Sequence, residues 1–278
     1  MLILFSDAIR YLSTHDNTFI RYFQGHEKAV TCLAMHPGAD QFISCSADNT
    51  LRLWDTNTSN CCGKLILSSP YLAAFDPSAN VFAVASEAAQ TILLYDFRQY
   101  DKEPFASFDI LEHAHDVAAD MQLNGQNVSP ENIARGWNKL EFSNDGKSLL
   151  VGTRGPGHFL LDAFNGALRA YLYREQKGAR RLAAGEQNPE STDPSDCLLE
   201  TSGECSFTPD GRYVLSGMRN ENVLVWDTLK VTNVCRSRPI HTLEMNSEAA
   251  VLAFNPRYNF FATADKELVL WIPQADEE

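Results

Sequence analysis

Four side chains near the N-terminus have the types and spacing to do chemistry: His26, Ser44, Asp48 and Trp54. Serine, histidine and aspartate make a hydrolytic triad, in which the histidine activates the serine hydroxyl and the aspartate orients the histidine. The same groups, joined to an indole N–H, also form buried hydrogen-bond chains that clamp β-strands, because each group satisfies another. The sequence has no G-x-S-x-G nucleophile elbow, which favours the structural interpretation.

The strands that must position these residues recur along the chain. The apolar run TLRLWD ends at Asp55, and the similar run TILLYD ends 41 residues later at Asp96. VLVWD ends at Asp227, and Trp271 in LVLWI follows Trp226 by 45 residues. Short β-branched runs with W-D endings and a period of about 40–45 residues predict the four-stranded blades of a WD40 β-propeller.

A second marker accompanies each repeat, at the turn that joins its first two strands. These turns read MHPGADQF, FDPSANVF, FSNDGKSL, FTPDGRYV and FNPRYNFF. Proline, asparagine, aspartate and glycine at such positions favour tight turns. Because the two markers stay in register with each other, the sequence predicts an all-β propeller.

We expect one propeller domain over residues 1–278, with about 21 strands. It comprises a partial blade at 1–24, four-stranded blades at 25–68, 69–111, 137–174 and 198–245, and a last blade at 246–273. A seven-bladed ring has roughly 28 strands, so we expect about one and a half N-terminal blades to be missing; a smaller five-bladed ring is the alternative. The polar stretches 112–136 and 175–197 are interpreted as loop inserts, either plain surface loops or binding loops.

The composition of the chain limits the classes of function that it can have. With 44% hydrophobic residues the chain is globular, and its net charge of −13 argues against direct binding of nucleic-acid phosphates. Seven cysteines without a C-x-x-C pair favour a reducing compartment over a disulfide framework. His113 and His115 lack a third ligand cluster, and no phosphate-binding glycine loop occurs, so we expect neither a metal nor a cofactor. No apolar run is long enough to span a bilayer.

Several segments resemble one family beyond the general repeat pattern. DAIRYLSTHDNTFIRYFQGHEKAV (7–30) and YDFRQYDKEPFASF (95–108) are the most specific, followed by LEFSNDGKSLL, LDAFNG, CSFTPDGRYV, FNPRYNFFATA and LWIP. They resemble the WD-repeat subunit shared by the COMPASS histone H3 methyltransferase complex and, in yeasts, the cleavage and polyadenylation factor. The resemblance covers nearly the whole chain apart from the two inserts.

This resemblance implies a nuclear, seven-bladed scaffold that has no catalytic activity of its own. It implies that a partner SET-domain enzyme methylates lysine 4 of histone H3, coupled to the C-terminal domain of transcribing RNA polymerase II. It also implies links to mRNA 3′-end processing and transcription termination, in some organisms through a phosphatase complex.

The resemblance transfers no catalytic residue to this chain. As a candidate partner surface we nominate residues on the loops that lead into first and third strands, with ordinary solvated surface as the alternative. They are Lys28, Asp48, Arg154, Arg219 and Glu221. Three other functions stay open: a generic WD40 adaptor such as a ubiquitin-ligase substrate receptor, a propeller enzyme, and a non-functional product of a truncated gene.

Overall fold

A computed structural model gives the fold of the chain. It describes residues 2–5, 8–123, 125, 128–174, 204–218, 222–231, 233–245, 249, 251–265 and 267–273, and every count below refers to these residues. The chain divides into two compact units, which we describe separately. Unit 1 comprises Met1–Ile110, Leu140–Phe142 and Ala163–Gly166; unit 2 comprises Leu111–Lys139, Ser143–Asp162 and Ala167–Glu278.

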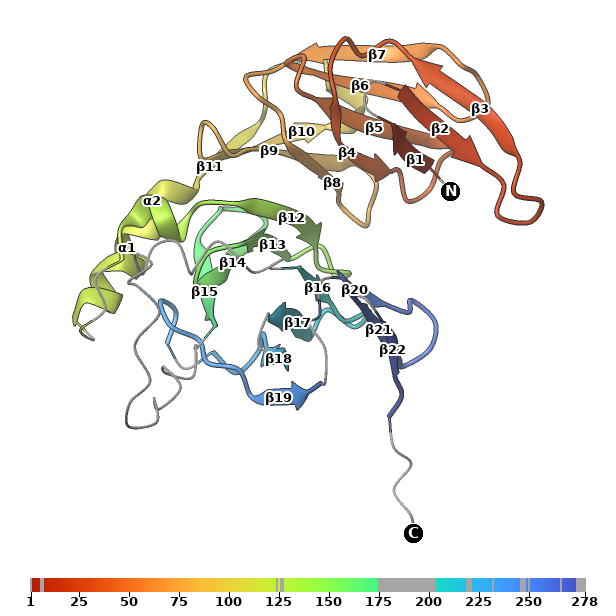
Figure 1. Cartoon of the computed structure of the whole chain (residues 1–278). Helices are drawn as coiled ribbons and strands as arrows, with labels where there is room; N and C mark the ends of the chain where they lie inside the picture. The colour runs from red at the N-terminus through yellow and green to blue at the C-terminus, as the bar shows by residue number, and fades with distance from the viewer. Residues whose placement is uncertain are drawn as a thin grey trace, which may run out of the picture. The chain divides into compact units, whose positions relative to one another are not determined.

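Unit 1 contains three antiparallel sheets whose strands pair in chain order (Figure 1). The first sheet, β1-β2-β3, is formed by Leu2–Phe5, Ala8–Leu12 and Phe19–Gln24. The second sheet is formed by β4 (Val30–Met35), β5 (Gln41–Ser46), β6 (Thr50–Asp55) and β7 (Cys61–Ile66). The third sheet is formed by β8 (Leu72–Phe75), β9 (Val81–Ser86), β10 (Thr91–Asp96) and β11 (Ala106–Asp109).

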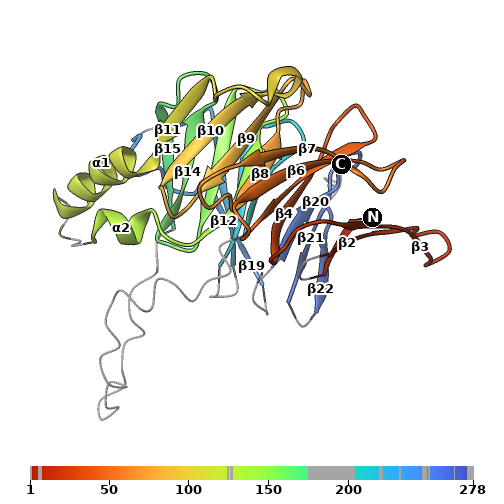
Figure 2. The same cartoon turned by 90° about the horizontal axis from the view of Figure 1, so that it is seen from above.

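Unit 2 contains three further sheets, and β12 of the first of them extends into the residues assigned to unit 1. The first is formed by β12 (Trp137–Phe142), β13 (Ser148–Thr153), β14 (Gly157–Asp162) and β15 (Leu168–Tyr173). The second is formed by β16 (Cys205–Phe207), β17 (Tyr213–Met218), β18 (Asn222–Asp227) and β19 (His241–Glu244). The third has three strands, β20 (Val251–Phe254), β21 (Phe261–Ala264) and β22 (Leu268–Trp271), which Figure 2 shows from above.

These sheets confirm the prediction of an all-β fold built from antiparallel four-stranded repeats. The described residues form 22 strands, one more than expected, because Leu2–Phe5 pairs with β2 as a full strand. The sequence places only four apolar residues there, which is too few to distinguish a complete strand from the end of one. The predicted single domain and the seven-bladed count stay predictions.

Three of the five predicted turns between first and second strands share one backbone geometry. In each of these three turns, the residue three positions after the first turn residue adopts a left-handed backbone conformation. These residues are Ala79 with φ 64°, Gly146 with φ 69° and Gly211 with φ 70°. In each case its N–H donates to the carbonyl three residues earlier, at 2.8–2.9 Å. Glycine adopts this conformation freely, whereas alanine in it is strained by its Cβ.

The prediction of a loop insert at 112–136 is wrong for most of that stretch. Helix α1 covers Ile110–Leu123, and a short helix α2 covers Pro130–Ile133. The side chains of Ile110, Ala114, Val117 and Met121 are fully buried, which is the spacing of one helical face. The polar composition of the stretch concealed this apolar stripe. The other predicted insert, 175–197, lies outside the described residues.

No described helix is both long and apolar enough to cross a membrane.

Candidate functional site

The four residues that opened the sequence analysis form one hydrogen-bond chain. His26 Nε2 lies 2.7 Å from Ser44 Oγ, and Trp54 Nε1 donates to the same Oγ at 2.9 Å. His26 Nδ1 lies 3.0 Å from Asp48 Oδ2. The directions are consistent when His26 is neutral with its proton on Nδ1: the indole donates to Ser44, Ser44 donates to Nε2, and Nδ1 donates to Asp48.

Four local elements bring these groups together. His26 lies in the loop that leads into β4, Ser44 is in the middle of β5, Asp48 is in the β5–β6 turn, and Trp54 is near the end of β6. Strands β5 and β6 are joined by a three-residue turn, and their register sets Phe42 opposite Trp54. The whole hydrogen-bond chain therefore lies within one sheet and the loop before it.

Hydrogen bonds set the charge of Asp48. Burial raises its pKa, but donation from the Thr50 hydroxyl, the Glu27 N–H and His26 holds the pKa of this carboxyl well below its usual range. Burial lowers the pKa of His26, and the interaction with Asp48 only partly opposes that effect. Near neutral pH, the pair is therefore a carboxylate that accepts a hydrogen bond from a neutral imidazole.

The geometry matches a Ser-His-Asp triad in distances but not in access. The side chain of Ser44 is fully buried, and Trp54 already donates to its hydroxyl oxygen. A nucleophile needs a space about 3 Å from its oxygen where a substrate carbon and its oxyanion donors can meet. Ser44 is buried and its hydroxyl is already bonded to both Trp54 and His26, so the arrangement fits a structural hydrogen-bond chain better than an accessible nucleophile.

A second histidine has a related arrangement that the sequence analysis missed. His158 on β14 places Nε2 2.7 Å from Ser216 Oγ on β17. The Thr153 N–H donates to His158 Nδ1 at 3.1 Å, so the proton of this neutral ring is on Nε2 and is donated to Ser216. The sequence signal was present, since Gly157-His158 repeats the Gly25-His26 dipeptide, but it lies inside a strand of the preceding sheet.

The two histidines also have similar aromatic neighbours. The ring centroids of His158 and Trp226 lie 6.4 Å apart in an edge-on contact, and those of His26 and Trp54 lie 6.2 Å apart. Trp226 differs in its acceptor, because its indole N–H donates to the Ser237 carbonyl. The two sheets thus use the same residue types with different hydrogen-bond connections.

The nominated surface residues are only partly described. Lys28 is exposed in the loop before β4, and its carbonyl accepts a hydrogen bond from Ser46 Oγ at 3.1 Å. Arg154 is exposed in the β13–β14 turn. Lys28 belongs to unit 1 and Arg154 to unit 2. Arg219 and Glu221 lie outside the described residues, and the carboxylate of Asp48 belongs to the hydrogen-bond chain described above, so this surface stays a prediction.

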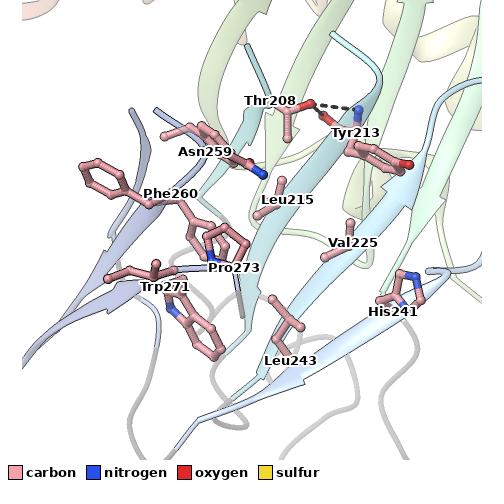
Figure 3. A pocket seen from close by; sticks show the side chains of 13 residues that line it. Thr208, Tyr213, Leu215, Val225, His241, Leu243, Asn259, Phe260, Trp271 and Pro273 are labelled. Atoms are coloured by element: carbon pink, nitrogen blue, oxygen red, sulfur yellow. Dashed lines mark hydrogen bonds between the residues drawn. The ribbon is translucent and has the colours of Figure 1, made fainter. Parts of the chain in front are cut away.

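Unit 2 also carries an apolar groove of about 390 Å³ between its last two sheets (Figure 3). Leu215, Val225 and Leu243 line one side, from β17, β18 and β19. The opposite side has Trp271 stacked on Phe261, with ring centroids 5.5 Å apart and planes inclined by 7°. Its described lining contains no carboxylate or thiol and one histidine, His241, and is otherwise mostly apolar, so the groove suits apolar side chains.

Metal ligands do not cluster in the described residues. No group of three or more histidine, cysteine, aspartate or glutamate side chains there is arranged to hold an ion. His113 and His115 both lie on α1, where His115 is exposed.

The sequence also matches a known family model and several known proteins. The family model "WD domain, G-beta repeat" matches residues 17–55 and 203–227, which confirms the WD40 assignment. WD repeat-containing protein 82 of Drosophila melanogaster is 34% identical over 278 residues, covering 98% of this chain and 72% of the relative. COMPASS component SWD2 of Saccharomyces cerevisiae is 32% identical over 269 residues, covering 95% and 70%. Set1 complex component swd2 of Schizosaccharomyces pombe is 27% identical over 297 residues, covering 95% and 74%.

Proposed function

The chain belongs to the WD40-repeat family of WD repeat-containing protein 82 and COMPASS component SWD2, and from this membership we propose that it is a scaffold subunit of a Set1/COMPASS-type complex. In that role it holds a SET-domain methyltransferase that modifies lysine 4 of histone H3. The observation that carries the proposal is similarity to two such subunits along 95% of the chain. The proposed location is the nucleus.

The structure supports a binding role over a catalytic one. Trp54 already donates to the Ser44 hydroxyl of the Ser-His-Asp arrangement, and the apolar groove has His241 in its lining without a carboxylate or thiol. We therefore propose that the chain has no turnover of its own and that methyl transfer resides in the partner enzyme. The net charge of −13 supports protein partners with basic surfaces rather than direct contact with nucleic acid.

A link to mRNA 3′-end processing and transcription termination is a further part of this proposal. It rests on the resemblance of residues 7–30 and 95–108 to the subunit that COMPASS shares with the cleavage and polyadenylation factor. The proposed partners in that role are cleavage and polyadenylation factor subunits, phosphatase subunits and the C-terminal domain of RNA polymerase II.

Affinity purification from nuclear extract, read by mass spectrometry, tests the proposal. The tagged chain is expected to recover a SET-domain methyltransferase and its associated subunits. Recovery of ubiquitin-ligase subunits without chromatin factors would replace the proposal with the generic adaptor. Turnover by the purified chain alone, in a hydrolase or methyltransferase assay, would contradict the non-catalytic role.

Charge-reversal variants test the nominated surface in the same experiment. Lys28→Glu and Arg154→Glu change exposed side chains on those loops, and Lys230→Glu changes an exposed lysine on the loop after β18 as the matched control. If the surface is correct, methyltransferase recovery falls for the first two and is unchanged for the control. Equal recovery from all three would reject the surface and leave the scaffold function standing.

A further inference from the structure

Two adjacent cysteines are exposed at the start of β7. Cys61 and Cys62 are the first two residues of this strand, and both thiols are free. The other described cysteines are buried or half-buried. Because a sulfur must be accessible to bind an ion from solution, these two are the best placed sulfur ligands among the described residues.

A β-bulge in unit 1 contains this pair. Leu53 of β6 pairs with Gly63, and Trp54, the next residue of β6, pairs with Cys61. Cys62 is therefore an extra residue of β7 that has no partner of its own in β6. Bulges of this kind bend the strand and re-aim a side chain.

The bulge changes the exposure of the first cysteine. Side chains of a regular strand point alternately to opposite faces. Gly63 and Leu65 are half-buried, so alternation alone would make Cys61 half-buried with them. Cys61 is exposed instead, as Cys62 is. Both sulfurs can therefore reach the same ligand in solution.

Neither thiol bonds to another described side chain. The Cys61 S–H donates to the Gly63 carbonyl, with Sγ and O 3.0 Å apart, and the Cys62 S–H donates to the Asn60 carbonyl at 3.8 Å. A thiol is a weak donor, so the sulfurs lose little when these contacts are replaced by bonds to an ion.

The spacing of adjacent residues favours a bridging ion over a disulfide. Neighbouring Cα atoms are about 3.8 Å apart, which is less than the roughly 4.4–6.8 Å between the Cα atoms of ordinary disulfides. A disulfide between Cys61 and Cys62 would therefore be strained. An ion that binds both sulfurs lengthens the bridge by two bonds of about 2.3 Å each and avoids this strain.

The number of sulfurs decides the class of ion. Thiolates select soft ions, of which zinc, the iron of iron–sulfur clusters and Cu(I) are the usual ones in proteins. Zinc takes three or four protein ligands, and an iron–sulfur cluster takes four cysteines. No described group of three or more histidine, cysteine, aspartate or glutamate side chains is arranged to hold an ion. Cu(I) is the ion of this set that two thiolates satisfy.

We propose that Cys61 and Cys62 form a two-thiolate site for Cu(I). Binding breaks both S–H bonds, forms two copper–sulfur bonds and releases two protons to solvent, while copper stays Cu(I). The complex carries one net negative charge, which the ammonium of exposed Lys64, two residues after Cys62, partly offsets. The site uses no residue of the His26 hydrogen-bond chain, and the proposal holds whichever complex the chain joins.

Anaerobic competition with a coloured chelator tests this proposal on the full chain. Cu(I)–bicinchoninate is titrated with the reduced protein, and the loss of its absorbance measures the Cu(I) that the protein takes. Cys61→Ser and Cys62→Ser are each expected to weaken binding at least tenfold. Cys235→Ser, at a half-buried position of the β18–β19 loop, is the matched control and is expected to leave the affinity unchanged.

Two further measurements make the test specific. X-ray absorption at the copper edge is expected to show two sulfur neighbours in the parent chain. The same competition with Zn(II) and a zinc chelator is expected to show no binding that depends on Cys61 or Cys62. Circular dichroism melts establish that the serine variants fold, as the exposure of both positions predicts.

Four results would overturn the proposal. The first is no transfer of Cu(I) from the chelator, and the second is equal affinity in the parent chain and both serine variants, which would mean adventitious binding at other thiols. The third is zinc binding that both variants abolish, which would require further ligands at this site. The fourth is a dimer in light scattering that forms only with Cu(I), which would place the two sulfurs of each site on different chains.

Discussion

The Nε2 atom of His158 lies 2.7 Å from the Oγ atom of Ser216, although 58 residues separate them in the chain. Ser216 lies on the second strand of its sheet, as Ser44 does, but its histidine comes from the third strand of the preceding sheet rather than from the loop before the first strand. This hydrogen bond connects β14 to β17. Both side chains are fully buried, so each supplies the other with a hydrogen-bond partner that water cannot provide.

Removing this histidine is expected to destabilise unit 2. His158→Ala leaves the buried Ser216 hydroxyl and the Thr153 N–H without their partner and opens a cavity, at a cost of about 2–4 kcal/mol. Urea unfolding followed by tryptophan fluorescence measures the loss. The matched control is His241→Ala at an exposed position, for which less than about 0.5 kcal/mol is expected. Equal effects would mean that the bond contributes nothing specific.

The same residue predicts a dependence of stability on pH. Burial, with a smaller contribution from the nearby Arg174 charge, holds the pKa of His158 well below its ordinary 6.5. Above pH 6.5 the ring is neutral in both states and the free energy of unfolding does not change through this group. Below pH 6.5 the unfolded chain binds the proton and the folded chain does not, so stability falls as pH falls.

Comparison with a variant isolates this effect. Unfolding free energies measured from pH 7.5 to 5 are expected to decline less steeply for His158→Gln than for the parent chain. His26, whose pKa burial also lowers, remains in both proteins and cancels in the comparison. Parallel curves would show that His158 titrates alike in the folded and unfolded chain.

Ser44 and Trp54 are expected to be coupled. Ser44→Ala removes the acceptor of the Trp54 N–H and the partner of His26 Nε2, which should cost about 1–3 kcal/mol. Trp54→Phe should cost a similar amount, and the double variant less than the sum, because one lost bond is counted in both single changes. A double-mutant cycle from urea unfolding measures the coupling, and strict additivity would contradict the hydrogen-bond chain.

Ala79 is expected to be a site where glycine stabilises the protein. Its φ of 64° places it in the conformation that Gly211 adopts at the same position of another repeat. Ala79→Gly should raise the free energy of unfolding by about 1 kcal/mol, and Gly211→Ala should lower it by a similar amount. A Cβ at Gly211 would meet neighbouring atoms only at 3.6 Å, so the second change tests conformation and not crowding. Thermal melts of both variants provide the measurement, and a change of the same sign in both would contradict this explanation.

Helix α1 offers a test of the segment whose loop prediction was wrong. Val117 is fully buried, whereas Ala119 on the same helix is exposed. Val117→Asp should cost more than about 3 kcal/mol by burying an unpaired charge, and Ala119→Asp should cost less than about 0.5 kcal/mol. Similar urea midpoints for the two variants would mean that the helix does not dock through this face.

How far the sequence predicts this protein depends on how local each feature is. The repeat spacing located the strands of the four-stranded sheets, since alternating apolar runs and tight turns are read from neighbouring residues. It identified His26, Ser44, Asp48 and Trp54 as a set because all four lie within one sheet and its leading loop. It did not identify α1, since the apolar stripe of Ile110, Ala114, Val117 and Met121 is carried by a polar stretch.

The sequence by itself determined the repeat, the strands and turns within each repeat, and the family. Each of these depends on contacts between residues close in the chain or on similarity along it. Only the tertiary structure decided that Ser44 is buried and bonded to Trp54, that His158 reaches Ser216, and that a groove opens beside β22. These features depend on burial and on which side chains meet within and between the folded sheets, and the repeat pattern does not specify either.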